Sequence, residues 1–431
     1  ILVHARRVLE EAVRRDVDAG VWAVIDVDLV NAFPSFEWDS VGDAMATAMP
    51  ELEAWTRWCH ERAADVELPC GELHRARRGA EQGDPHGSLQ CGAVVAVLVR
   101  AAMAELARRK GAPLPECFSF WYCDDGQVVC RPKDVDLFLE CLDAAAARVG
   151  ATRGEGPDVK SLVRLVGHPD ALAAFQLEDP EGEWLTPRVR RTCKVGAPNA
   201  ACEVLGAAVG PADACEQLFR DRLEKLKELH DALPEVDDPA TELTLGRLCA
   251  SVTKSTHVLR AAGDCVGEAA LEDHDAALDR FVSRALGGDL PKSALDQAAL
   301  GVSQGGLGFR RATGLALPAF VASRVEARPF VEHLFASMAN AGVAVPGAMA
   351  LYDAQTAAAA ERVGSGLWRS VVNICSISSL RQGDQPLQNF QIFQIIKHPN
   401  MSEYSRHFQA LKYAIKYCSC NFVIKPLCLP C

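Results

Sequence analysis

The pattern of apolar and polar positions changes along the chain, from short mixed elements to long helices. Short runs of β-forming residues and longer segments with apolar residues at helical spacing alternate over the first 150 residues. The predicted strands are residues 22–28, 118–122 and 127–129. The predicted helices are residues 3–17, 88–110 and 134–149, the last with Asp134 at its N-cap and closing at Gly150. A tight turn at Cys123-Asp124-Asp125-Gly126 joins the last two strands into a hairpin.

After residue 211 the periodicity is helical. Apolar residues recur at helical spacing from Leu218 to Leu233. The predicted helices here are residues 212–233, 241–263, 272–287 and 315–340. Strands followed by helices predict an α+β domain and then a helical one.

Composition changes sharply near Arg369. Residues 369–431 carry a net charge of +5, which leaves −17 for residues 1–368 of a chain whose total is −12. Alanine almost disappears from this tail, while Ile, Gln, Asn and Tyr become frequent. The tail is therefore either a different module, folded or disordered, or translated non-coding sequence, and we favour the non-coding origin.

Composition also limits the class of protein. The 431 residues are 49% hydrophobic and 24% charged, which is typical of globular domains. The most apolar stretch, residues 92–106, contains Arg100 and Glu105, so we expect no membrane span and no membrane partner. The 17 cysteines form no disulfide framework, which favours an intracellular protein of the cytoplasm or nucleus. The first residue is Ile, so we expect a fragment.

Three acidic segments carry the candidate chemistry. They are Asp26-Val-Asp28-Leu-Val-Asn-Ala-Phe33 at the end of a strand, Arg78-Gly-Ala-Glu-Gln-Gly-Asp-Pro85 before a helix, and Tyr122-Cys-Asp-Asp125 at the hairpin turn. Carboxylates that meet at one point repel unless a cation neutralises them, and hard oxygen ligands favour Mg²⁺ or alternatively Mn²⁺. Two such ions can activate a 3′-hydroxyl and stabilise a leaving pyrophosphate.

In this order the segments resemble motifs A, B and C of reverse transcriptases, nearest to those of non-LTR retrotransposons. The spacing is 56 residues from Asp28 to Asp84 and 40 from Asp84 to Asp124. The resemblance is specific over residues 21–210, where Val204-Leu-Gly206 resembles motif E. Pro34 departs from the family pattern, and only 27 residues precede Asp28, too few for the fingers motifs.

The resemblance implies roles for particular residues. It implies catalytic roles for Asp28, Asp124, Asp125 and Lys160, the last from a faint motif D. It implies metal ligands at Asp28, Leu29, Asp124 and Asp125. It implies substrate contacts at Phe33, Gln82, Gly83 and Arg78, with Phe33 as the gate that excludes a ribose 2′-hydroxyl. Asp26 is interpreted as a strand-face carboxylate, and Asp84 and Pro85 as turn and cap formers.

The resemblance also implies a fold and partners. We expect a right-hand polymerase palm, an antiparallel sheet backed by helices 88–110 and 134–149 with the aspartates on its open face. The expected domains are a palm with a remnant of the fingers over 1–210, a helical thumb over 211–300, a helical extension over 301–368, and the tail over 369–431. The expected partners are an RNA template, a DNA primer and dNTPs, and the oligomeric state stays open.

Two other interpretations stay open. The chain is alternatively a polymerase-like scaffold that binds nucleic acid without catalysis, or the remnant of a retroelement with no present function. The cysteines at 418, 420, 428 and 431, with His407, offer a weaker zinc hypothesis whose spacing fits no strong pattern.

Overall fold

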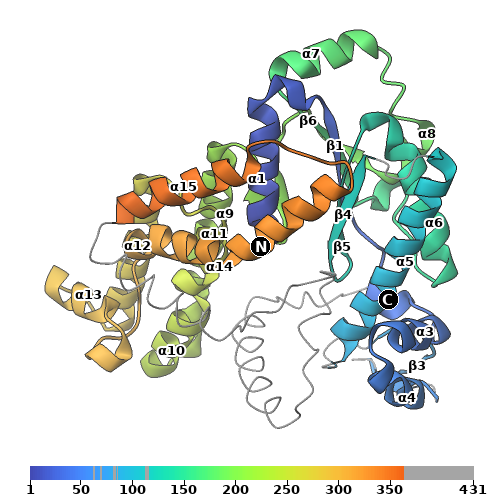
Figure 1. The fold of residues 1–431 in the computed structure, drawn as a ribbon. Helices are drawn as coiled ribbons and strands as arrows, with labels where there is room; N and C mark the ends of the chain where they lie inside the picture. Colours follow the sequence, from blue (N-terminus) through green and yellow to red (C-terminus); the bar gives the residue numbers. More distant parts are fainter. Residues whose placement is uncertain (62–63, 68–69, 81–83, 85, 112–115, 364–431) are drawn as a thin grey trace. The chain divides into compact units, whose positions relative to one another are not determined.

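The computed structural model describes residues 1–61, 64–67, 70–80, 84, 86–111 and 116–363. These residues form two compact units (Figure 1). The first comprises residues 1–205 and 327–354, and the second comprises 206–326 and the described residues from 355 onward. The helices α14 (Ala312–Asn340) and α15 (Ala348–Val363) contribute residues to both units. The fold class is α+β, as predicted from the sequence.

A five-stranded sheet organises the first unit. Its strand order is β4-β5-β1-β6-β7. The strands are β1 (Trp22–Val27), β4 (Cys117–Tyr122), β5 (Asp125–Cys130), β6 (Leu162–Val166) and β7 (Lys194–Val195). Neighbouring strands are antiparallel except β6 and β7, which pair in parallel. The prediction of a purely antiparallel sheet is therefore wrong at this edge, because the chain returns through α7 (Pro169–Glu178) and α8 (Pro187–Thr192) before it forms β7.

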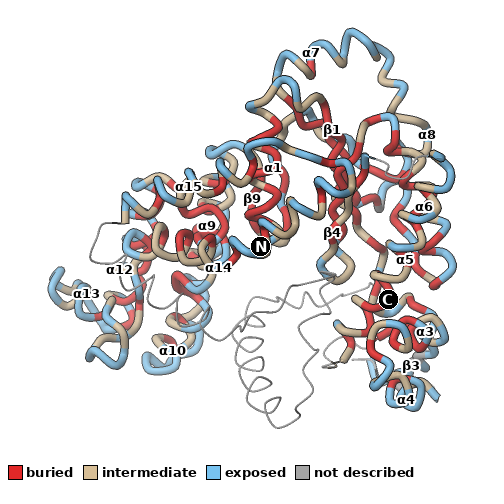
Figure 2. Tube along the Cα trace, viewed as in Figure 1, coloured by how far each residue is buried: buried red, intermediate tan, exposed pale blue. Residues whose placement is uncertain are grey.

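Side chains of β1 alternate between two covered faces of this sheet. Ala23, Ile25 and Val27 belong to the core that includes buried residues of α5 (Gly87–Lys110) and α6 (Val135–Arg148). Trp22 and Val24 point to the opposite face. Figure 2 shows the resulting run of buried residues along β1.

Helices also cover part of the face that was predicted to be open. Leu9 and Val13 of α1 (Leu2–Arg15) and Met338 of α14 pack there against Trp22 and Val24. The expectation of an open face is therefore wrong for the middle of the sheet. The physical reason is that this face carries large apolar side chains, which gain more from burial than from exposure to water.

A buried ionic network joins α1 to the same face. The side chains of Arg6, Glu10 and Arg164 have no exposed surface. Arg164 donates through Nη1 to Glu10 Oε2 at 2.8 Å, and Arg6 Nε donates to the other oxygen of Glu10. Because these charges lie in the interior, each depends on its partner, and removing one leaves an uncompensated charge.

Smaller elements complete the first unit. They are α2 (Ala32–Ser35), α3 (Trp38–Ala48), α4 (Pro50–Cys59), β2 (Ala64–Glu67), β3 (Leu73–Ala76) and β8 (Cys202–Val204). Strands β2 and β3 form a separate antiparallel hairpin. The tight turn after β8 uses positive φ at Leu205 (50°) and Gly206 (78°), and the division between the units falls at this turn.

The second unit begins with β9 (Ala207–Val209), and helices make up most of it. Besides the parts of α14 and α15 that belong to it, they are α9 (Ala212–Ala232), α10 (Pro239–Cys249), α11 (Thr256–Ala262), α12 (Glu268–Ala285) and α13 (Lys292–Ala299). The single helix predicted over 241–263 is wrong, because the chain breaks between α10 and α11. The hydroxyl of Ser251 there accepts a hydrogen bond from the Thr253 amide, which competes with helical bonding.

Candidate active site

The site predicted from the motifs lies in the first unit, where β1 ends. Asp28 directly follows the last residue of β1 and is half-buried. Its backbone N–H donates to the hydroxyl of Ser161 at 3.0 Å, and Ser161 is buried. Two residues on, the Val30 amide donates to the Thr152 carbonyl at 2.8 Å. The end of β1 is therefore held against the segment that leads into β6.

Asp124 and Asp125 lie at the tip of the β4–β5 hairpin. Tyr122 pairs with Asp125, so Cys123 and Asp124 form a two-residue turn. Cys123 has φ of 53°, a left-handed conformation that costs a non-glycine residue energy. Such strain persists only where the surrounding structure enforces it, here to close the hairpin at the two aspartates.

The strand register brings this tip to Asp28. Val27 pairs with Gly126 in the antiparallel ladder between β1 and β5. The next residues in each direction are Asp28 and Asp125, so the two carboxylates leave neighbouring strands at the same corner of the sheet. Side chains alternate along a strand, and Asp28 and Asp26 therefore share one face.

Negative charge accumulates at this corner. Burial raises the pKa of Asp124, the charge of Asp28 raises it further, and Lys160 opposes the rise. Asp125 is exposed by surface area, yet enough protein surrounds its carboxyl group to raise its pKa to about 6. The charges of Asp124, Asp28 and Asp26 add to this effect, in that order. The structure thus brings the three predicted carboxylates into one electrostatic cluster.

The donor atoms of the cluster suit a divalent cation. Carboxylate oxygens are the donors that Mg²⁺ prefers, and burial together with the neighbouring carboxylates raises the pKa values of Asp124 and Asp125, a cost that a bound cation relieves. Across the described residues, however, no three His, Cys, Asp or Glu side chains are already arranged to hold a metal ion. Leu29, the fourth predicted ligand, is buried and forms an isolated antiparallel bridge with Arg153. The donor chemistry fits, and the carboxylates are gathered without converging on one point.

The predicted substrate contacts are only partly described. Phe33 is half-buried against the core, and its carbonyl accepts from the Ala80 amide at 2.7 Å. Arg78 is exposed, with its guanidinium 3.9 Å from the carboxylate of Glu37. Gln82 and Gly83 lie outside the described residues, as do the cysteines and histidine of the zinc hypothesis.

Gly79 fixes the approach of the second motif to the first. Its amide donates to the Phe36 carbonyl at 2.6 Å, and its own carbonyl accepts from the Trp38 indole at 2.9 Å. Gly79 has a φ of 84°, and a Cβ added to it would lie 2.3 Å from the Pro34 Cα. Only glycine therefore fits at this position. The segments around residues 33–38 and 79–80 are therefore one packed unit.

Two other predicted residues have defined places. Lys160 is exposed, and its charge reaches Asp124. The Asp84 carboxylate accepts from the His86 amide at 2.9 Å, and its carbonyl accepts from the Gly87 amide at 3.0 Å. Asp84 therefore forms the turn before α5, as the sequence predicted.

Sequence reasoning missed the partners behind the site. Asp26 pairs with Arg6 of α1 at 3.4 Å, and Arg6 also donates to the side chain of Gln127 at 3.4 Å. The interpretation of Asp26 as a strand-face carboxylate holds, but it lacked this partner. The only local signal was the i,i+4 spacing of Arg6 and Glu10, which many surface helices share.

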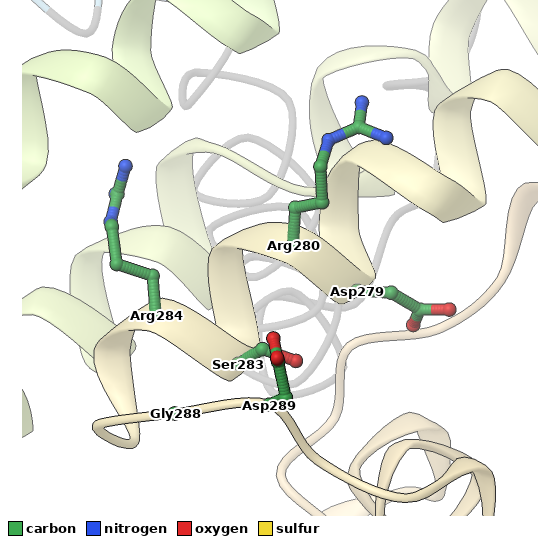
Figure 3. A pocket seen from close by; sticks show the side chains of 6 residues that line it. All are labelled: Asp279, Arg280, Ser283, Arg284, Gly288 and Asp289. Atoms are coloured by element: carbon green, nitrogen blue, oxygen red, sulfur yellow. The ribbon is translucent and has the colours of Figure 1, made fainter.

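The second unit contains a separate surface cavity of about 310 Å³. Its lining residues are Asp279, Arg280, Ser283, Arg284, Gly288 and Asp289 (Figure 3). Two of its four charged residues have partners elsewhere, since Asp279 accepts from Arg311 at 2.8 Å and Arg284 donates to Glu242 at 3.2 Å. None of the predicted site residues lines this cavity.

Helix α5 is long and apolar enough to cross a membrane by length and composition alone, the one such helix within the described residues. Its residues Cys91, Val94 and Leu98 are buried in the core of the first unit. A core helix meets the same criterion, so this is weak evidence for a span.

A scan against protein-family models finds no match for the chain, and no curated protein matches its sequence.

Proposed function

We propose that the chain is part of an RNA-directed DNA polymerase of the reverse transcriptase type, with the palm in the first unit and a helical thumb in the second. The proposal rests on the resemblance of three ordered motifs. The observation that carries it is the gathering of Asp28, Asp124 and Asp125 at one corner of the sheet, from two strands that the sequence separates by almost one hundred residues.

In this proposal the residues of the corner have distinct tasks. Asp28, Asp124 and Asp125 hold Mg²⁺ or Mn²⁺, together with the Leu29 carbonyl. The bound ions supply neutralising charge and lower the pKa of the primer 3′-hydroxyl. Lys160 places a positive charge toward Asp124, where it stabilises the negative charge of the leaving pyrophosphate.

Positioning of the nucleotide belongs to the neighbouring segment. Phe33, held through the bond from Ala80, presents its ring to the sugar of the incoming dNTP. Arg78 is exposed and pairs only distantly with Glu37, so its guanidinium is available to a phosphate oxygen.

Primer extension tests the proposal. The full chain is given a DNA primer on an RNA template, dNTPs and Mg²⁺, and the Asp124→Asn variant is compared with Asp289→Asn, which removes one negative charge from an exposed loop of the second unit. We expect extension by the parent chain and by Asp289→Asn, and a loss of at least about 10²-fold in Asp124→Asn. Equal extension by all three proteins would place the chemistry elsewhere.

A catalytically inactive nucleic-acid-binding scaffold is the second candidate. A scaffold slows the migration of the labelled primer–template in a native gel but does not extend the primer, and Asp124→Asn leaves that binding unchanged. The parent chain and Asp124→Asn therefore distinguish the two functions.

A further inference from the structure

Two buried cysteines face each other at the base of the hairpin that carries Asp124 and Asp125. Cys117 is the first residue of β4, Cys130 is the last of β5, and the two are direct partners in the antiparallel register. Both are completely buried and both are free thiols. Cysteine thiols in this arrangement are candidates for a bond between the strands.

The kind of pair decides whether a disulfide fits. Across a two-residue hairpin turn, the closing pair Tyr122–Asp125 is hydrogen-bonded, and bonded and non-bonded pairs then alternate along the ladder. Cys117–Cys130 is the fifth pair beyond the closing one, so it is a non-hydrogen-bonded pair. The Cα atoms of such pairs lie about 4.5 Å apart, which is within the range of about 4.4–6.8 Å found in disulfides.

The sulfur atoms are also close. A hydrogen bond with the Cys117 thiol, together with burial, holds the pKa of Cys130 well above its usual value. The Cys130 thiol is therefore protonated at neutral pH and unreactive while the sheet is closed. Cys123 lies at the other end of the hairpin, in the turn, and is not a cross-strand partner of either residue.

We propose that Cys117 and Cys130 are a redox modification site, which forms a cross-strand disulfide when the chain meets a small disulfide such as oxidised glutathione. One thiol loses its proton and attacks the small disulfide, which releases one glutathione thiolate and leaves a mixed disulfide. The second thiol loses its proton and attacks the protein sulfur of that mixed disulfide, releasing the second glutathione thiolate, and both thiolates take up the released protons. The cysteine pair is oxidised by two electrons, and the glutathione disulfide is reduced by two.

The position of β4 gives the oxidant a route to the pair. Among the described strands β4 is at the edge of the sheet and pairs with β5 alone, so it can open without breaking another of these strand pairings. Once formed, the bond ties the base of the hairpin while the turn at its tip stays free. The reduced state belongs to a reducing compartment, and the disulfide forms when that compartment becomes oxidising.

Peptide mapping of the oxidised full chain tests the inference. The protein is incubated with oxidised glutathione, free thiols are alkylated under denaturing conditions, and the chain is cut with chymotrypsin and endoproteinase Asp-N. Cleavage after Tyr122 and before Asp124 separates Cys117, Cys123 and Cys130 into different peptides. We expect a linked pair of peptides that contains Cys117 and Cys130 and disappears on treatment with dithiothreitol.

Variants provide the control. Cys117→Ser and Cys130→Ser are each expected to lose the linked pair, and Cys91→Ser, which removes a buried thiol of α5, is expected to keep it. Oxidation is also expected to raise the urea midpoint of the parent chain but not that of Cys117→Ser or Cys130→Ser.

Recovery of Cys117 and Cys130 as alkylated thiols, while the exposed Cys59 is oxidised, would overturn the inference. So would a disulfide that joins either residue to Cys123. The mapping does not depend on polymerase activity, so it stands or falls apart from the proposed function.

Discussion

Neutralising Asp125 should stabilise the fold. Its pKa rises from 3.8 to about 6, because burial and three neighbouring carboxylates disfavour its charged form. A shift of about two units corresponds to at most about 3 kcal/mol. Asp125 is exposed by surface area, so solvent screens part of this cost, and we expect Asp125→Asn to raise the free energy of unfolding by about 1 kcal/mol at pH 7.

The pH dependence gives this prediction its sign. The folded state binds the Asp125 proton more tightly than the unfolded state, so the cost of the charge is present above pH 6 and is relieved as the pH falls toward 4. The gain in Asp125→Asn should therefore shrink over this range and vanish near pH 4. The Asp125→Asn variant should also lose any stabilisation that Mg²⁺ gives the parent chain.

Tryptophan fluorescence during urea unfolding measures the effect. All the tryptophans of the described residues lie in the first unit with Asp125, so their signal reports on that unit. Asp289→Asn serves as the control for the loss of one charge. The electrostatic reasoning would be refuted if Asp125→Asn were no more stable than the parent at pH 7. It would also be refuted if the gain in the free energy of unfolding were the same at pH 7 and pH 4.

Three further substitutions test other parts of the structure. Glu10→Gln should lower the free energy of unfolding at neutral pH by about 3–5 kcal/mol, because it leaves the buried Arg164 without its carboxylate partner and Arg6 with Asp26 alone. An undiminished urea midpoint would contradict this. Gly79→Ala should lower the free energy of unfolding by about 2–4 kcal/mol through backbone strain and overlap with Pro34. Gly71→Ala, where φ is 83° and the space is open, should lower it by about 1 kcal/mol. Equal losses in the two variants would exclude the overlap. Phe33→Val should raise incorporation of ribonucleotides relative to dNTPs in primer extension, and an unchanged ratio would remove this residue from sugar selection.

Local patterns were sufficient for the elements that carry the aspartates. Residues 22–28 and 118–129 are rich in β-forming residues, and the turn at Cys123 and Asp124 divides the second segment into two strands. β1 and the β4–β5 hairpin were therefore predicted close to their observed bounds. The long helices α5, α6 and α9 were also predicted from apolar spacing. These elements depend on interactions between residues near in sequence.

Elements that depend on distant partners were missed. The strand β6 has Arg164 in its middle, which interrupts the apolar run in the sequence but lies buried against Glu10, 154 residues away. Asp134, predicted as an N-cap, occupies that position, but its carboxylate pairs instead with Lys110 at 2.5 Å. In the candidate site, the motifs identified Asp28, Asp124 and Asp125, whereas no local pattern indicated that Arg6 would pair with Asp26.

The central claim is that Asp28, Asp124 and Asp125 form one site for a divalent cation. Binding of Mn²⁺ to the full chain at pH 7.5, followed by electron paramagnetic resonance of the free ion, tests it most directly. We predict saturable binding that Mg²⁺ displaces, that Asp124→Asn abolishes or weakens at least about tenfold, and that Asp289→Asn leaves unchanged. Equal Mn²⁺ binding by the parent chain and Asp124→Asn would contradict the claim.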